Sequence, residues 1–188
     1  MKHKLLLLLR VLSLLLLFCF CFAQCKKQHD TPKTEIEKLP AITQEGKNTF
    51  GCLLNDTAYV SGGGGLLDNT LKCLYDPTFG GGDLSIKAKK YINGNDFISI
   101  TLNARPVNTS GNFLLTDGGV FGVAYFDTQS SCIFATGTPP PPLNINGNLT
   151  ITKFDNISRI ISGTFSFKVT TPACGIINAT DGRFDVKY

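Results

Sequence analysis

The chain has 188 residues, a formal net charge of +4 and only two histidines. Three basic residues lie in the first ten positions, and residues 49–188 contain ten basic and ten acidic side chains. A segment without net charge or a basic cluster lacks the surface that nucleic-acid binding requires, so we expect no nucleic-acid partner. Because His3 and His29 both precede residue 49, a Ser-His-Asp triad and a histidine-based metal site are excluded after that point.

The chain begins with the pattern of a secretory signal peptide. Two lysines precede an apolar run over residues 5–22, which is interrupted by Arg10 and Ser13. A basic start and a short apolar core are typical of exported proteins. An uncleaved transmembrane helix is the alternative, because the run is nearly long enough to span a bilayer, but a charge such as Arg10 is costly within the hydrocarbon. We therefore predict a signal peptide over residues 1–24.

A cysteine stands where the apolar run ends and the polar chain begins. Phe22-Ala23-Gln24-Cys25, followed by two lysines, resembles the lipidation box of bacterial lipoproteins in the looser form found in the Bacteroidota. The resemblance implies a diacylglycerol and palmitate on Cys25, and two or more acyl chains anchor a protein stably. Cleavage after Ala23, which leaves Cys25 as a free thiol, is the alternative. We expect an envelope protein on the periplasmic side of the outer membrane, because lysines follow the cysteine where surface-exported relatives have acidic residues.

Residues 25–48 are predicted to be the lipidated N-terminus and a flexible tether. The segment "KKQHDTPKTEIEKLPAITQEGKN" is polar, has two prolines and contains few large apolar side chains. Such a composition cannot bury enough surface to fold alone. At about 3.3 Å per residue, the tether would reach several tens of ångströms from the membrane.

Residues 49–188 show the period-two pattern of β-strands. "DLSIKAKKY" and "DFISITLN" alternate apolar and polar residues around Asn93-Gly94, which is a strong hairpin signal. "VFGVAYF", "NLTITKFD" and "IISGTFSFKV", with its core-facing Phe165 and Phe167, continue the pattern, and "DGRFDVKY" is expected after a turn at Asp181-Gly182. Glycine runs at 62–65 and 80–82 indicate loops. We predict one all-β domain, an antiparallel β-sandwich or a small barrel.

Part of the chain resembles a known group of proteins. "EKLPAITQEGKNTFGCLLN" and "NLTITKFDNISRIISGTFSFKV", together with the closing "TDGRFDVKY", resemble a family of uncharacterised Bacteroidota lipoproteins. The motifs are structural, a strand, a turn and a strand. The resemblance therefore implies an all-β fold and an envelope location, and it brings no activity with it.

Four cysteines remain after the leader and Cys25. Cys52, Cys73, Cys132 and Cys174 are widely spaced and contain no C-x-x-C pair, which argues against a zinc site made of four thiolates. In an oxidising periplasm an even number of cysteines favours disulfides, with three connectivities open. Buried free thiols that behave as small apolar side chains are the alternative.

No group of residues indicates catalysis, and we expect neither a metal nor another cofactor. Among the available carboxylates, Asp117 and Asp181 each precede a glycine, and Asp155 follows a strand, so turn formation accounts for all three. Asp127 and Asp185 complete the set. The glycine runs lack the Lys-Ser/Thr pair of a phosphate-binding loop. Thr57, in Asp56-Thr57-Ala58, resembles a Bacteroidota O-glycosylation site.

The sequence thus predicts a lipid-anchored envelope protein that is not an enzyme. A structural or protein-interaction module is the first hypothesis, with another envelope protein as its partner. The alternative is a carrier that binds a small apolar ligand in a pocket of the β domain. The two differ in their expected structures: a carrier needs a cavity lined by apolar side chains, whereas an interaction module needs a filled core and an exposed apolar patch.

Overall fold

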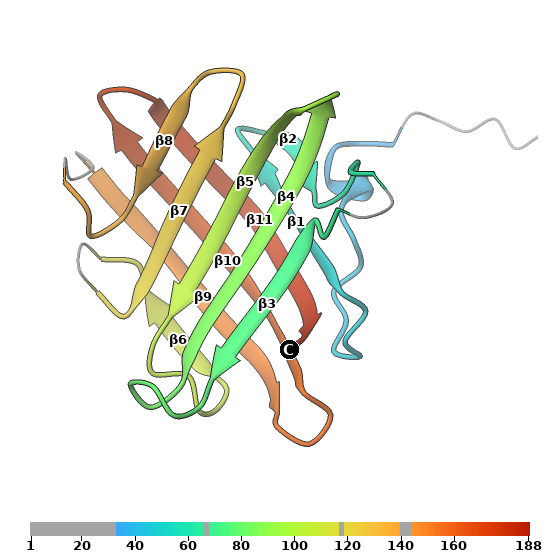
Figure 1. Cartoon of the computed structure of the whole chain (residues 1–188), viewed down its shortest axis with the longest axis vertical. Helices are drawn as coiled ribbons and strands as arrows, with labels where there is room; N and C mark the ends of the chain where they lie inside the picture. The colour runs from blue at the N-terminus through green and yellow to red at the C-terminus, as the bar shows by residue number, and fades with distance from the viewer. Residues whose placement is uncertain (1–32, 66–67, 117–118, 140–143) are drawn as a thin grey trace, which may run out of the picture. The chain divides into compact units, whose positions relative to one another are not determined.

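Two antiparallel sheets pack face to face in the computed structural model, which describes residues 33–65, 68–116, 119–139 and 144–188 (Figure 1). The six-stranded sheet has the order β2-β1-β11-β10-β9-β6. Its strands are β1 (Thr49–Leu54), β2 (Thr57–Val60), β6 (Gly111–Leu114), β9 (Asn144–Asp155), β10 (Ile160–Thr171) and β11 (Gly175–Lys187). The five-stranded sheet has the order β3-β4-β5-β7-β8. Its strands are β3 (Leu71–Asp76), β4 (Asp83–Asn93), β5 (Asp96–Ala104), β7 (Phe121–Asp127) and β8 (Cys132–Ala135).

Alternation along each strand decides which side chains enter the core. In β4, Leu84, Ile86 and Ala88 are buried, while Lys87 between them is exposed. Successive side chains of a strand point to opposite faces, so the apolar set of every strand turns towards the opposite sheet. The predicted hairpin between β4 and β5 is confirmed, and Gly94 has the positive φ of 55° that this tight turn requires.

Aromatic and branched side chains fill the space between the sheets. Phe50, Tyr59 and Phe121 are at most 1% exposed. Phe165 and Phe167 are also buried, which confirms the predicted core face of β10, and the Phe165 ring lies 5.0 Å from that of Phe50. The buried Tyr59 hydroxyl donates to the Ala88 carbonyl oxygen at 2.9 Å, so this polar atom is satisfied inside the core.

The domain is a sandwich and is not closed into a barrel. The prediction of an all-β fold is confirmed, and of the two architectures the sandwich is the one observed. On one side the two sheets come together, because Gly62, just after β2, forms a bridge with Lys90 of β4. β8 ends the five-stranded sheet on the other side, four strands away from β3.

The predicted turn at Asp181-Gly182 is wrong, because β11 continues through both residues. Asp181 has a φ of 53°, and the pairing of β11 with β10 shifts register between Phe165 and Phe167. These are the properties of a β-bulge. A Cβ atom at Gly182 would overlap the Phe165 carbonyl oxygen, so glycine is needed here for close backbone approach and not for a turn.

The flexible tether predicted over residues 25–48 is wrong for residues 33–48. These residues belong to the compact unit Lys33–Tyr188, and we call residues 33–48 the strap. The strap contains the 3₁₀ helix η1 (Ile36–Lys38), and Leu39 after it is 8% exposed. Residues 25–32 lie outside the described part of the chain. In the described part, no helix has the length and apolar character needed to cross a membrane.

Candidate functional site

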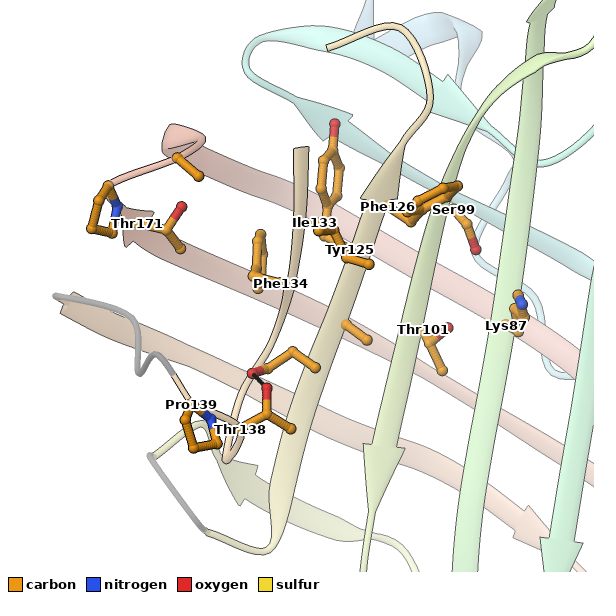
Figure 2. Close-up of a pocket in the computed structure, with 14 residues that line it drawn as sticks. Lys87, Ser99, Thr101, Tyr125, Phe126, Ile133, Phe134, Thr138, Pro139 and Thr171 are labelled. Atoms are coloured by element: carbon orange, nitrogen blue, oxygen red, sulfur yellow. Dashed lines mark hydrogen bonds between the residues drawn. The ribbon is translucent and has the colours of Figure 1, made fainter. Parts of the chain in front are cut away.

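A groove of about 540 Å³ crosses the outer face of the five-stranded sheet at its β8 end (Figure 2). We call it the β8 groove. Its lining comes from four strands of this sheet, from the residues after β8, and from the end of β10 with the turn that follows it. The lining residues are Lys87, Ser99, Thr101, Ala124, Tyr125, Phe126, Ile133, Phe134, Ala135, Thr138, Pro139, Thr171, Pro172 and Ala173.

The floor of the groove is a row of short side chains that crosses the strands. Sheet register aligns Lys87 of β4 with Thr101 of β5, then with Ala124 of β7 and Ala135 of β8. Adjacent strands lie about 4.8 Å apart, so the row is roughly 14 Å long. Because three of its members are threonine or alanine, the sheet surface is hollow here. Lys87 contributes the one charged side chain of the lining and stands at the end of the row away from β8.

The neighbouring row supplies an exposed apolar wall. Ser99, Phe126 and Ile133 are aligned across β5, β7 and β8. Phe126 and Ile133 are 38% and 65% exposed, whereas Ser99 between the larger side chains is buried. The Phe126 ring packs 5.5 Å from that of Phe97, and the Lys89 ammonium lies 4.6 Å from the centre of the Phe97 ring. The wall therefore continues into an aromatic cluster with a cation on it.

A disulfide holds the β8 end of the groove in place. Cys132, the first residue of β8, is bonded to Cys174 in the β10–β11 turn, and their Cα atoms are 5.3 Å apart. The same turn contributes Pro172 and Ala173 to the lining. This bond joins the edge of one sheet to a turn of the other. The β8 strand is thus fixed covalently although it is only four residues long.

A second hollow of about 470 Å³ continues the groove along the same face. It shares Ala124 and Ala135 with the β8 groove, and its remaining lining is more polar, with Asp83, Asn103 and Arg105. The outer face of this sheet therefore carries one long depression, apolar near Phe126 and polar near Arg105. An elongated ligand or polypeptide segment has room to lie along it.

The structure settles the predicted cysteine pairing in part. Of the four candidate disulfide cysteines, Cys132 and Cys174 form a disulfide, whereas Cys52 and Cys73 are free thiols. Burial raises the pKa of both free thiols to about 12, so neither is a thiolate at neutral pH. Cys52 thus fits the alternative of a buried free thiol in the core, and Cys73 is partly buried against that core.

The candidate carboxylates do not come together at the groove. Asp127 accepts hydrogen bonds from the backbone N–H of Gln129 and from the Ser130 hydroxyl, and Asp155 accepts two from backbone N–H groups of the turn after β9. Asp181 lies in the β11 bulge, and Asp117 lies outside the described residues. Among the described residues, no group of three or more His, Cys, Asp or Glu side chains could hold a metal ion.

Asp185, the remaining carboxylate, attaches the strap to the six-stranded sheet. It is 1% exposed and accepts five hydrogen bonds, four from the strap and one from Ser162. Burial by itself would raise the pKa of Asp185, but the hydrogen bonds from Thr43, Ser162 and the backbone N–H groups outweigh it and hold the pKa well below its usual value. The side chain therefore has a structural role that its position in the sequence did not reveal.

Of the two candidate modification sites, one lies within the described part of the chain and the other does not. Thr57, the candidate O-glycosylation site, is exposed at the start of β2. Cys25, the candidate lipidation site, lies outside the described residues.

Comparison with protein-family models, curated proteins and solved structures finds no match to this chain.

Sequence reasoning did not identify the β8 groove, although a signal was present. The outward positions of two neighbouring strands carry unusually short side chains, namely Ser99 and Thr101 in β5 and Ala124 in β7. Outward polar positions are normally filled by longer side chains that cover the sheet. The order of the strands was needed to see that these residues are adjacent to Ala135 of β8.

Proposed function

We propose that this chain is a lipid-anchored protein of the bacterial cell envelope and acts as a non-catalytic protein-interaction module. The observation that carries the proposal is the β8 groove, an open depression on the outer face of a sheet whose inner face is filled by core side chains. Phe126 and Ile133 at its wall are large, apolar and exposed. A contiguous exposed apolar patch bordered by polar residues is typical of a protein-interaction site.

The strap supports an arrangement in which the domain is held close to a membrane. If Cys25 carries lipid, the seven residues 26–32 connect it to the strap, and they span at most about 24 Å at 3.3 to 3.6 Å per residue. The strap packs beside β2, where Glu35 accepts a hydrogen bond from the Ala58 N–H at 2.8 Å. β8 lies at the opposite side of the sandwich from β2.

In-cell photocrosslinking tests the interaction surface. A photoreactive amino acid at Ile133 in the groove should give discrete crosslinked species in intact cells. The same residue at Ile157, which is 97% exposed on the β9–β10 turn, is the matched control and should give none. Ala124→Arg, which fills the floor of the groove, should abolish the Ile133 species. Equal crosslinking at both isoleucines, or none at Ile133, would contradict the proposal.

The anchor is tested separately from the groove. Cells expressing the wild-type chain should incorporate labelled palmitate into it, and Cys25→Ala should not. Globomycin, which blocks lipoprotein signal peptidase, should cause the uncleaved form to accumulate. Label on the Cys25→Ala chain, or no label on the wild type, would refute the lipoprotein assignment and leave the groove proposal standing.

A carrier of a small apolar ligand is the second candidate function, because the groove volume falls within the range of roughly 300 to 1,000 Å³ found for small-molecule pockets. Native mass spectrometry of the chain purified from its own cells separates the two functions. A bound lipid-sized mass that Ala124→Arg removes would favour the carrier. A protein without added mass would favour the interaction module.

A further inference from the structure

β8 presents hydrogen-bonding backbone groups towards the β8 groove. The strand pairs with β7 on one side only, and the Thr136 N–H donates to the Val123 carbonyl oxygen at 2.9 Å. In an antiparallel pair, hydrogen-bonding residues alternate with residues whose groups point the other way. Phe134 therefore bonds to β7, while the backbone groups of Ile133 and Ala135 point away from it. Thr138 donates its hydroxyl to the Ala135 carbonyl oxygen at 2.8 Å, which closes one end of this edge (Figure 2).

Three backbone groups are left at this edge, the N–H and C=O of Ile133 and the N–H of Ala135, and none has a partner among the described residues. The outer edge of β2 is different. There Glu35 accepts from the Ala58 N–H, and the Lys90 ammonium donates to the Ala58 carbonyl oxygen at 2.7 Å. Natural sheets usually protect their edges in such ways, because a bare edge is a template for another strand. Side chains thus cover the Ala58 groups of β2. The outward groups of Leu71, Cys73 and Tyr75 on the edge strand β3 also lack partners among the described residues, so it is the apolar groove beside it that sets the β8 edge apart.

We propose that the edge of β8 binds an extended, uncharged segment of a partner protein, which joins the five-stranded sheet as a sixth strand. This proposal rests on the proposed function and names the kind of partner. In this mode, known as β-augmentation, backbone hydrogen bonds provide affinity and pockets for alternate side chains provide specificity. The disulfide at Cys132 supports it, because a four-residue edge strand held covalently does not need to be ordered when the partner arrives.

The lining of the groove defines the chemistry of the segment. Next to the open edge lie Ile133, Phe134 and Ala135 on one side, and Pro172 and Ala173 of the β10–β11 turn on the other. The charged Lys87 is three strands away, at roughly 14 Å. A charged side chain would therefore be desolvated without a partner. We expect small or branched apolar residues at alternate positions of the bound segment.

A separate polypeptide segment fits this edge better than a second copy of the chain. The edge lies in a recess between the Pro172 turn and Pro139, so an isolated strand can enter it. A second copy would bring its own turn and its own Pro139 towards those of the first. Pairing over residues 133–135 alone would also bury far less than the roughly 1,200 Å² of a stable interface.

Selection from a phage-displayed library of random heptapeptides on the purified wild-type chain tests the proposal. The selected peptides should alternate apolar residues and lack charge at those positions. Ile133→Pro removes the outward N–H without removing a bond to β7, and proline is tolerated at a sheet edge. Affinity should fall at least tenfold for Ile133→Pro and change less than threefold for Ile133→Val, the matched control.

Backbone methylation of the selected peptide gives a second, independent measurement. N-methyl groups on the alternate amides that face β8 should abolish binding, while the same groups on the intervening amides should leave it within threefold. Suppose that the peptides bind the Ile133→Pro variant as tightly as the wild type but do not bind the Ala124→Arg variant. Strand addition is then refuted, while the groove remains an interaction site. No enrichment over an unrelated protein would also overturn the proposal. If the wild type forms dimers and the Ile133→Pro variant is monomeric, the occupant of the edge is a second copy of this chain and the proposed partner segment is refuted.

Discussion

Replacing Asp185 with asparagine tests whether one buried carboxylate holds the strap to the sheet. Its Oδ2 atom accepts from the Thr43 hydroxyl at 2.6 Å and from the backbone N–H groups of Glu45 and Lys47 at 3.0 and 3.1 Å. Its Oδ1 atom accepts from the Gly46 N–H at 2.8 Å, and also from Ser162 of β10. Asparagine has the same shape, but it has a single acceptor oxygen and no charge.

The expected loss of stability follows from these contacts. If the amide nitrogen takes the place of Oδ1, the Gly46 N–H loses its acceptor, which costs about 1 to 3 kcal/mol for a buried donor. The three bonds to Oδ2 remain but lose their charge assistance, at about 1 kcal/mol each. Asp185→Asn should therefore lower the free energy of unfolding by about 4 to 6 kcal/mol, a large part of the 5 to 15 kcal/mol typical of a domain.

Urea denaturation of the chain produced without its leader measures this difference. Asp181→Asn is the matched control, since it makes the same change on the same strand at an exposed bulge and should cost less than about 0.5 kcal/mol. Hydrogen exchange at Gly46 should be much faster in Asp185→Asn. A change within 1 kcal/mol of wild type, with Gly46 still protected, would refute the role assigned to the carboxylate.

The same carboxylate predicts how stability depends on pH. Its pKa is held well below the 3.8 of an ordinary aspartate, so in acid the unfolded chain takes up this proton more readily than the folded chain. The stabilisation from Asp185 is therefore complete above about pH 5 and is lost as the pH falls through 3.8 and below. Asp185→Asn should show a weaker loss of stability between pH 5 and pH 2.

Two further predictions concern the cysteines. The disulfide closes a loop of 42 residues, so Cys132→Ala with Cys174→Ala should lower the free energy of unfolding by about 4 kcal/mol, and a loss below 1 kcal/mol in urea titrations would contradict this. Cys52 and Cys73, whose pKa values burial raises to about 12, should resist iodoacetamide at pH 8 in the folded chain. Residues 33–188 should take up two labels when unfolded without reductant and four with it, whereas rapid labelling of the folded chain would show that the thiols are accessible.

Local patterns in the sequence predicted the features that depend on local physics. The alternation in β4 and β5 and the Asn93-Gly94 turn gave the correct hairpin, because hydrophobic period and turn conformation are both encoded within a few residues. Asp181-Gly182 misled for the same reason. An aspartate–glycine pair is as suitable for a bulge as for a turn, and only the long-range pairing of β11 with β10 distinguishes the two.

The strap shows why long-range polar contacts escape such reasoning. Residues 43–47 look like a linker, since their apolar content is low, and their order comes from an aspartate about 140 residues later in the chain. No periodicity marks an interaction between backbone N–H groups and one distant carboxylate. The groove was missed because Ala124 and Ala135 become neighbours only when β7 and β8 pair.

The two sides of the sandwich differ in what lies against their edge strands, and this difference bears on function more than the fold does. On the side of β2, Glu35 and Lys90 satisfy the N–H and C=O of Ala58, and η1 of the strap packs there. On the side of β8, the Cys132–Cys174 bond fixes the strand, while the outward backbone groups of Ile133 have no partner among the described residues and lie beside an apolar groove. A bare edge is a template for another strand, and at β8 this edge lies beside an apolar groove that can hold the side chains of such a strand. The proposed strand-binding site therefore rests on the combination of this edge and this groove, on the side of the sandwich opposite β2.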